Sequence, residues 1–496
     1  MDSARTIRNS TMTTYSFKGQ YIGGHWRDGT SSDAIIDQDP FTGETIASFP
    51  AATLADLDEA YSAAAQAQHK WAATGPSLRS DIFRKAAEIM RARRDEIVEW
   101  LIREAGSTRI KAEIEWQAVL SGMVEAASIP YRVEGKIIPI DTADTESRAY
   151  RRPIGVVGVI SPWNFPMHLS HRSIAPALAT GNAVVVKPAE DTPVTGGLLI
   201  ARIYEEAGLP AGILNIIVGD SKVIGDAFSL HDVPRFLSFT GSTRVGRLIG
   251  RHAMDAKIIK RVALELGGNS PFVVLADADI DQAARAAAFG RFLHQGQICM
   301  STNRVIVEDS VYDAFLERFV ACAAKLKYGN PHEPDTLIGP TINARQLAVN
   351  LHHLADAKSR LRMALGGEPE SAVIPPHIFA DVDNSDPLAQ SEMFAPIAFV
   401  IRARDEAHAL ELANATDSGL SSAVFTRDEA RGVRFALGIN AGMTHINDCT
   451  VADMPFNPFG GEKNSGLGRF GGDWIIDELT TTHWVTIRRG PIDYLA

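Results

Sequence analysis

The sequence predicts an α/β protein with two doubly wound parallel sheets and a small additional element of β-strands. From residue 154 onward, short and continuously apolar segments alternate with helical patterns, which is typical of parallel sheets that are covered on both faces. This alternation runs twice along the chain, and Cys299 stands near the start of the second series. The chain has 496 residues, of which 45% are hydrophobic and 22% charged, so it can form two substantial cores.

Helices are expected before the first series, since apolar and charged positions alternate at helical spacing over 54–71 and 78–105. The first series has a helix over 197–207, where Leu199, Ile203 and Ala207 recur at four-residue spacing. Its predicted strands are 155–161, 183–187, 213–218 and 235–239. The second series has predicted strands at 271–275, 303–308, 396–402, 421–425 and 442–446, with helices near 279–294, 310–327, 343–362, 404–415 and 428–437.

Two extended segments fit neither sheet. Residues 136–153 predict a hairpin, and residues 481–488 predict one further strand. Strands left over from complete sheets present unpaired edges that need a partner. An intramolecular flap and a contact between subunits are both compatible with this pattern.

Composition and charge argue against several classes of protein. The formal net charge of −11 disfavours general binding to nucleic acids or anionic membranes. Only three cysteines occur, so we expect no disulfide framework and a reducing, cytoplasmic location. The first 16 residues are polar and predict a loose tail, and no run of about 18 apolar residues suggests a membrane span. No Cys or His spacing is typical of a zinc site, so no metal is expected.

Three side chains indicate a possible chemistry. Cys299 can attack a carbonyl carbon, and Glu265, 34 positions earlier, can activate the water that releases the bound group. The side-chain amide of Asn164, together with the backbone N–H of Cys299, can stabilise the oxyanion that forms. Taken alone, a single cysteine is more often a small buried hydrophobe. The combination favours an enzyme that oxidises an aldehyde through a thioester.

The cofactor signals lie at strand ends. Residues 241–246 follow the predicted strand 235–239 and can cradle a phosphate, although a plain turn is an equally good reading; 219–225, which ends in Gly225, is a weaker candidate. Glu190 follows the strand 183–187, where a carboxylate can accept hydrogen bonds from ribose hydroxyls and repel a 2′-phosphate. This favours NAD over NADP, but Lys187 partly offsets the repulsion, so NADP stays possible.

From about residue 20 onward, the chain resembles the NAD(P)-dependent aldehyde dehydrogenase superfamily. Seven motifs in order carry the resemblance: Pro162-Trp163-Asn164-Phe165-Pro166, Lys187-Pro188-Ala189-Glu190, Phe239-Thr240-Gly241-Ser242-Thr243, Glu265-Leu266-Gly267-Gly268, Gly296-Gln297-Ile298-Cys299, Glu392-Met393-Phe394-Ala395-Pro396 and Pro458-Phe459-Gly460-Gly461. Any one motif would be a weak signal, whereas seven in the same order are a strong one.

The resemblance implies roles for individual residues. Cys299 matches the nucleophile, Glu265 the general base and Asn164 the oxyanion donor. The implied cofactor contacts are Lys187 and Glu190 at the adenosine ribose, Ser242 at the pyrophosphate, Trp163 along the cleft, Glu392 at the nicotinamide ribose and Phe394 beside the nicotinamide.

The resemblance also implies a division into domains. An NAD-binding domain is expected over 15–134 and 154–266, a catalytic domain over 267–466, and oligomerisation strands over 135–153 and 480–496. Members of the superfamily are usually dimers or tetramers, so a homo-oligomer is expected.

Two segments look most like the branch that acts on benzaldehyde- or vanillin-type aldehydes, namely 459–472 with 480–485, and 170–178. Aromatic walls for a flat ring would come from Phe165, Phe292, Phe456 and Phe459, although phenylalanines more often belong to the core. One departure is visible: many members carry a Glu, assigned to proton relay, where this chain has Phe470 after Gly468-Arg469. Glu265 is therefore the main candidate for the base.

Four alternatives remain open at this stage. The substrate can be an aliphatic aldehyde or a semialdehyde instead of an aromatic one. The acyl group can pass to coenzyme A, against which Glu265 argues, since a water-activating base suits hydrolysis. A cysteine acyltransferase or thioesterase without a redox step is disfavoured by the Gly241-Ser242-Thr243 turn and by Glu392. A non-enzymatic scaffold is disfavoured by the intact set of Cys299, Glu265 and Asn164.

Overall fold

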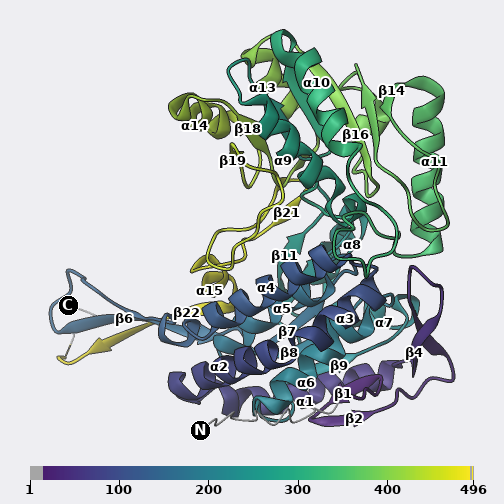
Figure 1. Ribbon diagram of the computed structural model, residues 1–496. Helices are drawn as coiled ribbons and strands as arrows, with labels where there is room; N and C mark the ends of the chain where they lie inside the picture. Colours follow the sequence, from purple (N-terminus) through teal and green to yellow (C-terminus); the bar gives the residue numbers. More distant parts are fainter. Residues whose placement is uncertain (1–14, 492–493, 495–496) are drawn as a thin grey trace, which may run out of the picture.

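The computed structural model describes residues 15–491 and 494, so most of the predicted N-terminal tail lies outside the described residues. Two large sheets form the lower and upper parts of the molecule in Figure 1, and an arm of strands projects to one side. The predicted α/β class with two helix-covered sheets and an extra β element is confirmed. None of the helices in the described part of the chain combines the length and apolar character that a membrane crossing requires.

The first sheet has eight strands, and its five central strands run parallel. Their spatial order is β2 (His25–Arg27), β1 (Gln20–Ile22), β9 (Leu214–Ile217), β8 (Ala183–Lys187), β7 (Val156–Ile160), β10 (Phe236–Thr240), β11 (Arg261–Glu265) and β21 (Gly466–Leu467). Successive side chains of β8 enter different cores: Val184 and Val186 pack on one face and Val185 on the other. All three are fully buried, which explains why the strand reads as a continuous apolar run.

Helices cover both faces of this sheet. One face carries α1 (Leu54–Ala72), α7 (Ser221–Leu230) and α8 (Thr243–Asp255). The other carries α5 (Pro166–Ala179) and α6 (Leu199–Glu206), which follows a π-helical turn, η2 (Val194–Leu198). Outside these two lie α2 (Pro76–Ala92), α3 (Arg94–Ala105) and α4 (Arg109–Ala126), followed by a 3-10 turn, η1 (Ile129–Tyr131). The two predicted segments 54–71 and 78–105 thus form three helices, α1 to α3.

The second sheet has seven strands, of which only the edge strand β14 is antiparallel. The order is β14 (Arg362–Leu365), β15 (His377–Ala380), β16 (Ile397–Ala403), β13 (Arg304–Glu308), β12 (Pro271–Val274), β18 (Ala423–Phe425) and β19 (His445–Ile446). On one face lie α9 (Ile280–Phe292) and α10 (Asp309–Ala323); on the other lie α11 (Ala344–Arg360), α13 (Glu406–Asn414) and α14 (Glu429–Gly438).

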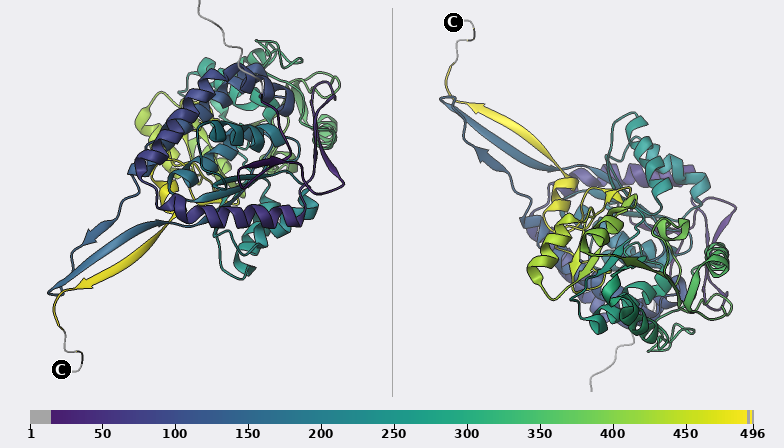
Figure 2. Two further views of the ribbon diagram at one scale, coloured as in Figure 1. Left: turned by 90° about the horizontal axis from the view of Figure 1, so that it is seen from below. Right: turned by 90° about the horizontal axis from the view of Figure 1, so that it is seen from above.

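The arm is a three-stranded antiparallel sheet made of β5 (Lys136–Ile138), β6 (Thr145–Pro153) and β22 (Thr480–Arg488). It matches the two leftover segments of the sequence. Figure 2 shows it extending away from the body in both views. Two of its apolar side chains are largely exposed: Ile137 at 74% and Trp484 at 67%.

The remaining elements are short. They are two strand pairs, β3 (Ala34–Gln38) with β4 (Thr45–Pro50) and β17 (Ser418–Gly419) with β20 (Glu462–Lys463), together with η3 (Leu293–Gly296), α12 (Pro387–Gln390) and α15 (Trp474–Leu479). β21 matters for the site, because it joins the late glycine-rich segment to β11, the strand that ends at Glu265.

Candidate active site

Cys299 lies in a tight loop between η3 and β13, where it is partly buried. The N–H of Ser301 donates to the carbonyl of Ile298 at 2.9 Å, which folds the chain around the cysteine. The segment that follows β11 passes directly beside this loop: a Cβ placed on Gly268 would lie 2.2 Å from the carbonyl oxygen of Cys299. Only glycine fits there.

The same segment meets Glu392 on its other side. The N–H of Gly268 donates to Glu392 Oε1 at 3.0 Å, and a Cβ on Gly267 would lie 2.4 Å from Glu392 Oε2. The glycine pair is therefore a place of close approach, where one extended segment separates the nucleophile loop from a predicted cofactor contact. The structure brings these two predicted site residues together around the Gly-Gly motif.

Asn164 lies between β7 and α5, and it is 5% exposed. Its side-chain Nδ2 donates to the carbonyl of Gln297 at 3.0 Å, two residues before Cys299. A side-chain amide carries two N–H groups, so one remains for a further acceptor. The amide is thus anchored to the nucleophile loop by the bond to Gln297.

The position of the Asn164 segment depends on α5, whose N-terminus has no side-chain cap of its own. Glu115 of α4 supplies it: Oε1 accepts the N–H groups of Met167 at 2.9 Å and His168 at 3.1 Å. Lys111 pairs with the other oxygen of Glu115 at 2.5 Å, and both side chains are fully buried. A carboxylate at a helix N-terminus is favourable, and here it fixes the turn that presents Asn164.

Glu265 is the last residue of β11 and is 2% exposed. Neither carboxyl oxygen has a hydrogen-bond partner among the described residues. Burial raises the pKa of Glu265 to about 8, the Arg172 guanidinium opposes this rise, and Asp453 adds to it. A buried carboxyl group with free oxygens can take up a proton near neutral pH, as a general base requires.

The surroundings of Cys299 favour the protonated thiol. Burial, together with the charges of Glu392, Glu265 and Asp453, raises its pKa to about 12, while Arg172 acts in the opposite direction. The thiolate is the nucleophilic form. The fraction of reactive thiolate therefore increases with pH across the neutral range.

The predicted adenosine-ribose contacts form a small network at the end of β8. Ser221 at the start of α7 donates to Glu190 Oε1 from its N–H at 2.7 Å and from its hydroxyl at 2.6 Å. Lys187 Nζ donates to Ser221 Oγ at 2.9 Å and lies 3.6 Å from Glu190 Oε1. Sequence reasoning missed Ser221, although it lies inside the 219–225 segment singled out as a weaker phosphate candidate.

The predicted phosphate turn is the N-terminus of α8. Ser242 is the N-cap, and its hydroxyl accepts the N–H of Val245 at 3.5 Å. The N–H of Gly241 donates to the carbonyl of Glu265 at 2.9 Å, which ties this turn to the strand that carries the base. Gly225 lies within α7, and a Cβ there would meet only the Cβ of Ser221, at 3.8 Å, so the helix is open beside Ser221.

The other predicted cofactor contacts come from opposite parts of the chain and meet. The rings of Trp163 and Phe394 pack edge to face with centroids 5.8 Å apart. Trp163 follows β7 of the first sheet, whereas Phe394 precedes β16 of the second. These groups suit a dinucleotide: the N-terminus of α8 can bind phosphate, the carboxylates of Glu190 and Glu392 can accept hydrogen bonds from ribose hydroxyls, and the two rings can pack against a planar base.

The family model of the aldehyde dehydrogenase family matches residues 26–485. The chain belongs to this family. It is 54% identical to a vanillin dehydrogenase of Corynebacterium glutamicum, over 94% of this chain and 97% of that one. It is 48% identical to a benzaldehyde dehydrogenase of Bacillus subtilis, over 95% and 96% of the two chains. The crystal structure of an NAD-dependent benzaldehyde dehydrogenase from Corynebacterium glutamicum matches with a TM-score of 0.89 and 49% identity, over 96% and 100%.

The aldehyde dehydrogenase fold places the four predicted aromatic wall residues in different surroundings. Phe165 is partly buried between the His294 ring, with centroids 5.6 Å apart, and the Lys111 ammonium, 4.2 Å from its ring. Phe456 is 57% exposed, and Phe459 is 3% exposed. Phe292 is fully buried and stacks on Phe319, so it belongs to the core between α9 and α10 and does not support a role as a pocket wall.

A charged cluster that sequence reasoning did not assign lies next to Glu265. Arg172 Nη2 is 3.9 Å from Glu265 Oε2, and Arg172 Nη1 is 3.2 Å from Asp453 Oδ2. His168 Nε2 is 2.8 Å from the same oxygen of Asp453. The available signal was the four-residue spacing of His168 and Arg172, which puts both on one face of α5.

This cluster lies beside the departure noted in the sequence. Phe459 and Phe470 exchange backbone hydrogen bonds of 3.0 and 2.8 Å, and the Arg172 guanidinium lies over both rings. Phe470 therefore contributes an aromatic face where many members of the superfamily have a carboxylate. Within the described residues, His, Cys, Asp and Glu side chains form no group suited to a metal ion.

Proposed function

We propose that this protein oxidises an aromatic aldehyde of the benzaldehyde or vanillin type to the carboxylic acid with NAD, through a thioester on Cys299. The observation that carries this proposal is the meeting of three groups near the ends of the two sheets: the Cys299 loop, the Asn164 amide anchored to it, and the carboxyl group of Glu265, which acts on the Cys299 thiol and has no hydrogen-bond partner among the described residues. The names of the relatives support the aromatic substrate and the choice of NAD.

In the first half of the reaction, Cys299 acts as the thiolate, its proton having passed to solvent, and Sγ bonds to the aldehyde carbon. The carbonyl oxygen becomes negatively charged and accepts hydrogen bonds from the Asn164 amide and the backbone N–H of Cys299. A bound nicotinamide supplies the acceptor for the hydride that then leaves this carbon. Cys299 is left carrying a thioester.

In the second half, Glu265 removes a proton from a water molecule as the water oxygen attacks the thioester carbon. The carbon–sulfur bond breaks, the thiolate of Cys299 returns, and the carboxylic acid leaves. The free oxygens of Glu265 suit this step, because a base that is already paired would first have to give up its partner.

The preference for NAD follows from Glu190 at the end of β8. Its carboxylate can accept hydrogen bonds from ribose hydroxyls and would repel a 2′-phosphate. Lys187 is 3% exposed and donates a hydrogen bond to Ser221. Its ammonium group is therefore already engaged within the protein and is less able to bind a 2′-phosphate. Burial lowers the pKa of Lys187, and Glu190 acts to raise it. NAD is therefore the expected cofactor, with weaker use of NADP.

The domain assignment extends this proposal. The first sheet and its helices form the NAD-binding domain, the second sheet forms the catalytic domain, and the arm joins copies of the chain into a homodimer or homotetramer. The exposed Ile137 and Trp484 on the arm support this use, since apolar side chains on exposed strands favour a partner. A cytoplasmic location stays a prediction from the few cysteines of the sequence.

The test is a screen of aromatic, aliphatic and semialdehyde substrates with NAD, read by NADH absorbance and by identification of the product. We expect benzaldehyde-type substrates to give the highest kcat/KM and the free acid to form without coenzyme A. A strict need for coenzyme A, or turnover of aliphatic aldehydes alone, would contradict the proposal. Absence of NAD and NADP binding by calorimetry would favour a cysteine acyltransferase or thioesterase.

A further inference from the structure

Two charged groups beside Glu265 take no part in the reaction steps above. Arg172 reaches in from α5, and Asp453 lies in the segment between β19 and β20. Their side chains are only 8% and 14% exposed. Burying an ion this deeply costs free energy of folding unless the ion is paired. The position of these two ions next to Glu265 therefore suggests that they affect Glu265.

The guanidinium of Arg172 packs against two aromatic rings in addition to its contacts with carboxyl groups. It lies 4.2 Å from the centre of the Phe459 ring and 4.7 Å from that of Phe470. Its Nε has no hydrogen-bond partner in the part of the chain that the structure describes. Planar guanidinium groups stack on aromatic faces, so these two rings fix the direction in which Nη1 and Nη2 point.

The two ends of the guanidinium face two carboxyl groups at different distances. Nη1 lies 3.2 Å from Asp453, within hydrogen-bond range, whereas Nη2 lies 3.9 Å from Glu265, within ion-pair range only. His168 also bonds to Asp453, so the closer carboxylate is shared between two donors. Arg172 is thus held mainly by Asp453 while its charge still reaches Glu265.

We propose that Arg172 is a positioning residue that favours the ionised form of Glu265, and that Asp453 limits this effect by holding the guanidinium at ion-pair distance. The inference rests on the proposed role of Glu265 as the base in thioester hydrolysis. A close, two-oxygen ion pair would occupy the oxygens that must accept the proton of water. When Asp453 keeps the guanidinium at this distance, Arg172 still stabilises the negative charge of Glu265 and leaves the Glu265 oxygens free to accept a proton.

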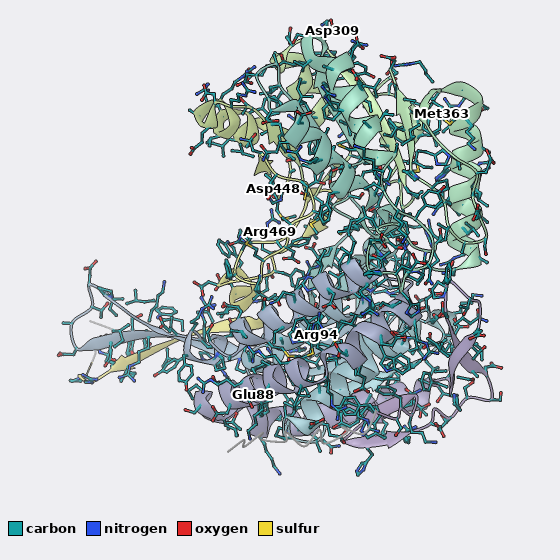
Figure 3. All side chains as sticks on the ribbon, in the orientation of Figure 1. Glu88, Arg94, Asp309, Met363, Asp448 and Arg469 are labelled. Carbon is teal, nitrogen blue, oxygen red and sulfur yellow. The ribbon has the colours of Figure 1, made fainter. Side chains whose placement is uncertain are left out.

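The charges that face Glu265 support this account. Burial raises its pKa, Arg172 and Arg469 lower it, and Asp453 raises it. Arg469, labelled in Figure 3, comes from the late glycine-rich segment, where the chain passes between the two sheets. The same two charges act on the pKa of the Cys299 thiol, which Glu265 raises and Arg172 lowers.

The pKa of Asp453 also differs from its usual range. Burial alone would raise its pKa, but the hydrogen bond from His168 and the charge of Arg172 bring the pKa below its usual range. We therefore expect the carboxylate of Asp453 to stay charged over the pH range in which Glu265 titrates. Glu392, in the loop that precedes β16, raises the pKa of the Cys299 thiol.

The experiment measures thioester hydrolysis as a function of pH in the holoenzyme. The acyl-enzyme is formed from NAD and an aromatic aldehyde at a pH below the midpoint, and hydrolysis is followed after a pH jump. Because the carboxylate is the active form, the rate constant should rise with pH through the pKa of Glu265. Glu265→Gln is the reference variant, and it should lose this rise.

Two variants should move the midpoint in opposite directions. Arg172→Met removes a neighbouring positive charge, so the midpoint should move up by about one pH unit or more. Asp453→Asn removes a negative charge and releases the guanidinium toward Glu265, so the midpoint should move down by a smaller amount. Arg172→Lys keeps the charge without the planar stacking, and its midpoint should lie between those of the wild type and Arg172→Met.

The outcomes separate this inference from the proposed function. If Glu265→Gln keeps the rise with pH, Glu265 is not the base, and the proposed function fails at that step. If Glu265→Gln loses the rise but the Arg172 and Asp453 variants leave the midpoint unchanged, or move it in the same direction, the inference is overturned. Melting temperature and NAD affinity are measured for every variant, and they identify a variant that is misfolded. If Arg172→Met does not fold, the midpoints of Asp453→Asn and Arg172→Lys distinguish the same outcomes.

Discussion

The two sides of the nucleophile are built in different ways. On the cofactor side, glycines let the backbone come into close contact with other segments: Gly268 against Cys299 and Gly267 against Glu392. On the side of the base, the contacts join side chains that are far apart in the sequence, such as Arg172 and Asp453. The cofactor side fixes the shape of the site through backbone contacts, whereas the side of the base determines the charges around Glu265.

The largest effect should come from Cys299→Ala. This variant should have no measurable dehydrogenase activity, because no other described side chain at the site can form the thioester. Affinity for NAD should be nearly unchanged, since the predicted cofactor contacts belong to other residues. Steady-state kinetics and calorimetry check the two halves of this prediction, and retained activity would remove the thiol mechanism.

Asn164→Ala tests the oxyanion donor that links the two sides. Loss of one such donor should lower kcat by about 10²–10³. Asn164→Asp keeps the volume of the side chain but replaces the donor with an acceptor, so it should be at least as inactive. If either variant kept wild-type kcat, the amide would serve only to hold the loop at Gln297.

Gly268→Ala tests the backbone contact on the cofactor side. The new methyl group would lie 2.2 Å from the carbonyl oxygen of Cys299, so the nucleophile loop must shift. We expect a fall in kcat/KM and a loss of about 1–3 kcal/mol in the free energy of unfolding. Gly250→Ala in α8 is the matched control, because its methyl group would meet only Leu264, at 3.8 Å, and it should be neutral or slightly stabilising. Equal behaviour of the two variants would contradict the packing argument.

The smallest effect is expected from Glu190→Gln, which keeps the shape of the ribose contact but removes its charge. The ratio of kcat/KM for NADP to that for NAD should increase, mainly through a lower KM for NADP. Lys187 and Ser221 remain to hold the network, so activity with NAD should change little. An unchanged ratio would show that the selection of cofactor lies elsewhere.

Sequence patterns predicted local features well. Both parallel sheets were recognised, and the strand β8 was predicted at 183–187 as observed, because a strand buried on both faces is apolar throughout. β11, which carries Glu265, was not predicted as a strand, since its five residues begin and end with charged side chains. α5 was expected only as a helical stretch without bounds between two strands, because Pro166 and Pro176 lie within it and proline argues against a helix in the sequence.

The substrate side was harder to predict for a physical reason. Phe292 and Phe459 look alike in the sequence, yet one packs in the core against Phe319 and the other lies under the Arg172 guanidinium. Asp453 lies 281 positions from Arg172, and no local periodicity connects them. Only the folded chain shows that Arg172 and Asp453 form an ion pair next to Glu265.

The most direct measurement of the central claim is mass spectrometry of the Glu265→Gln variant, mixed with NAD and benzaldehyde and then digested. Slowed hydrolysis should leave a benzoyl group on the peptide that contains Cys299, in an amount equal to the NADH formed in the first turnover. Formation of NADH with an unmodified Cys299 peptide, or a benzoyl group on another residue, would contradict the account.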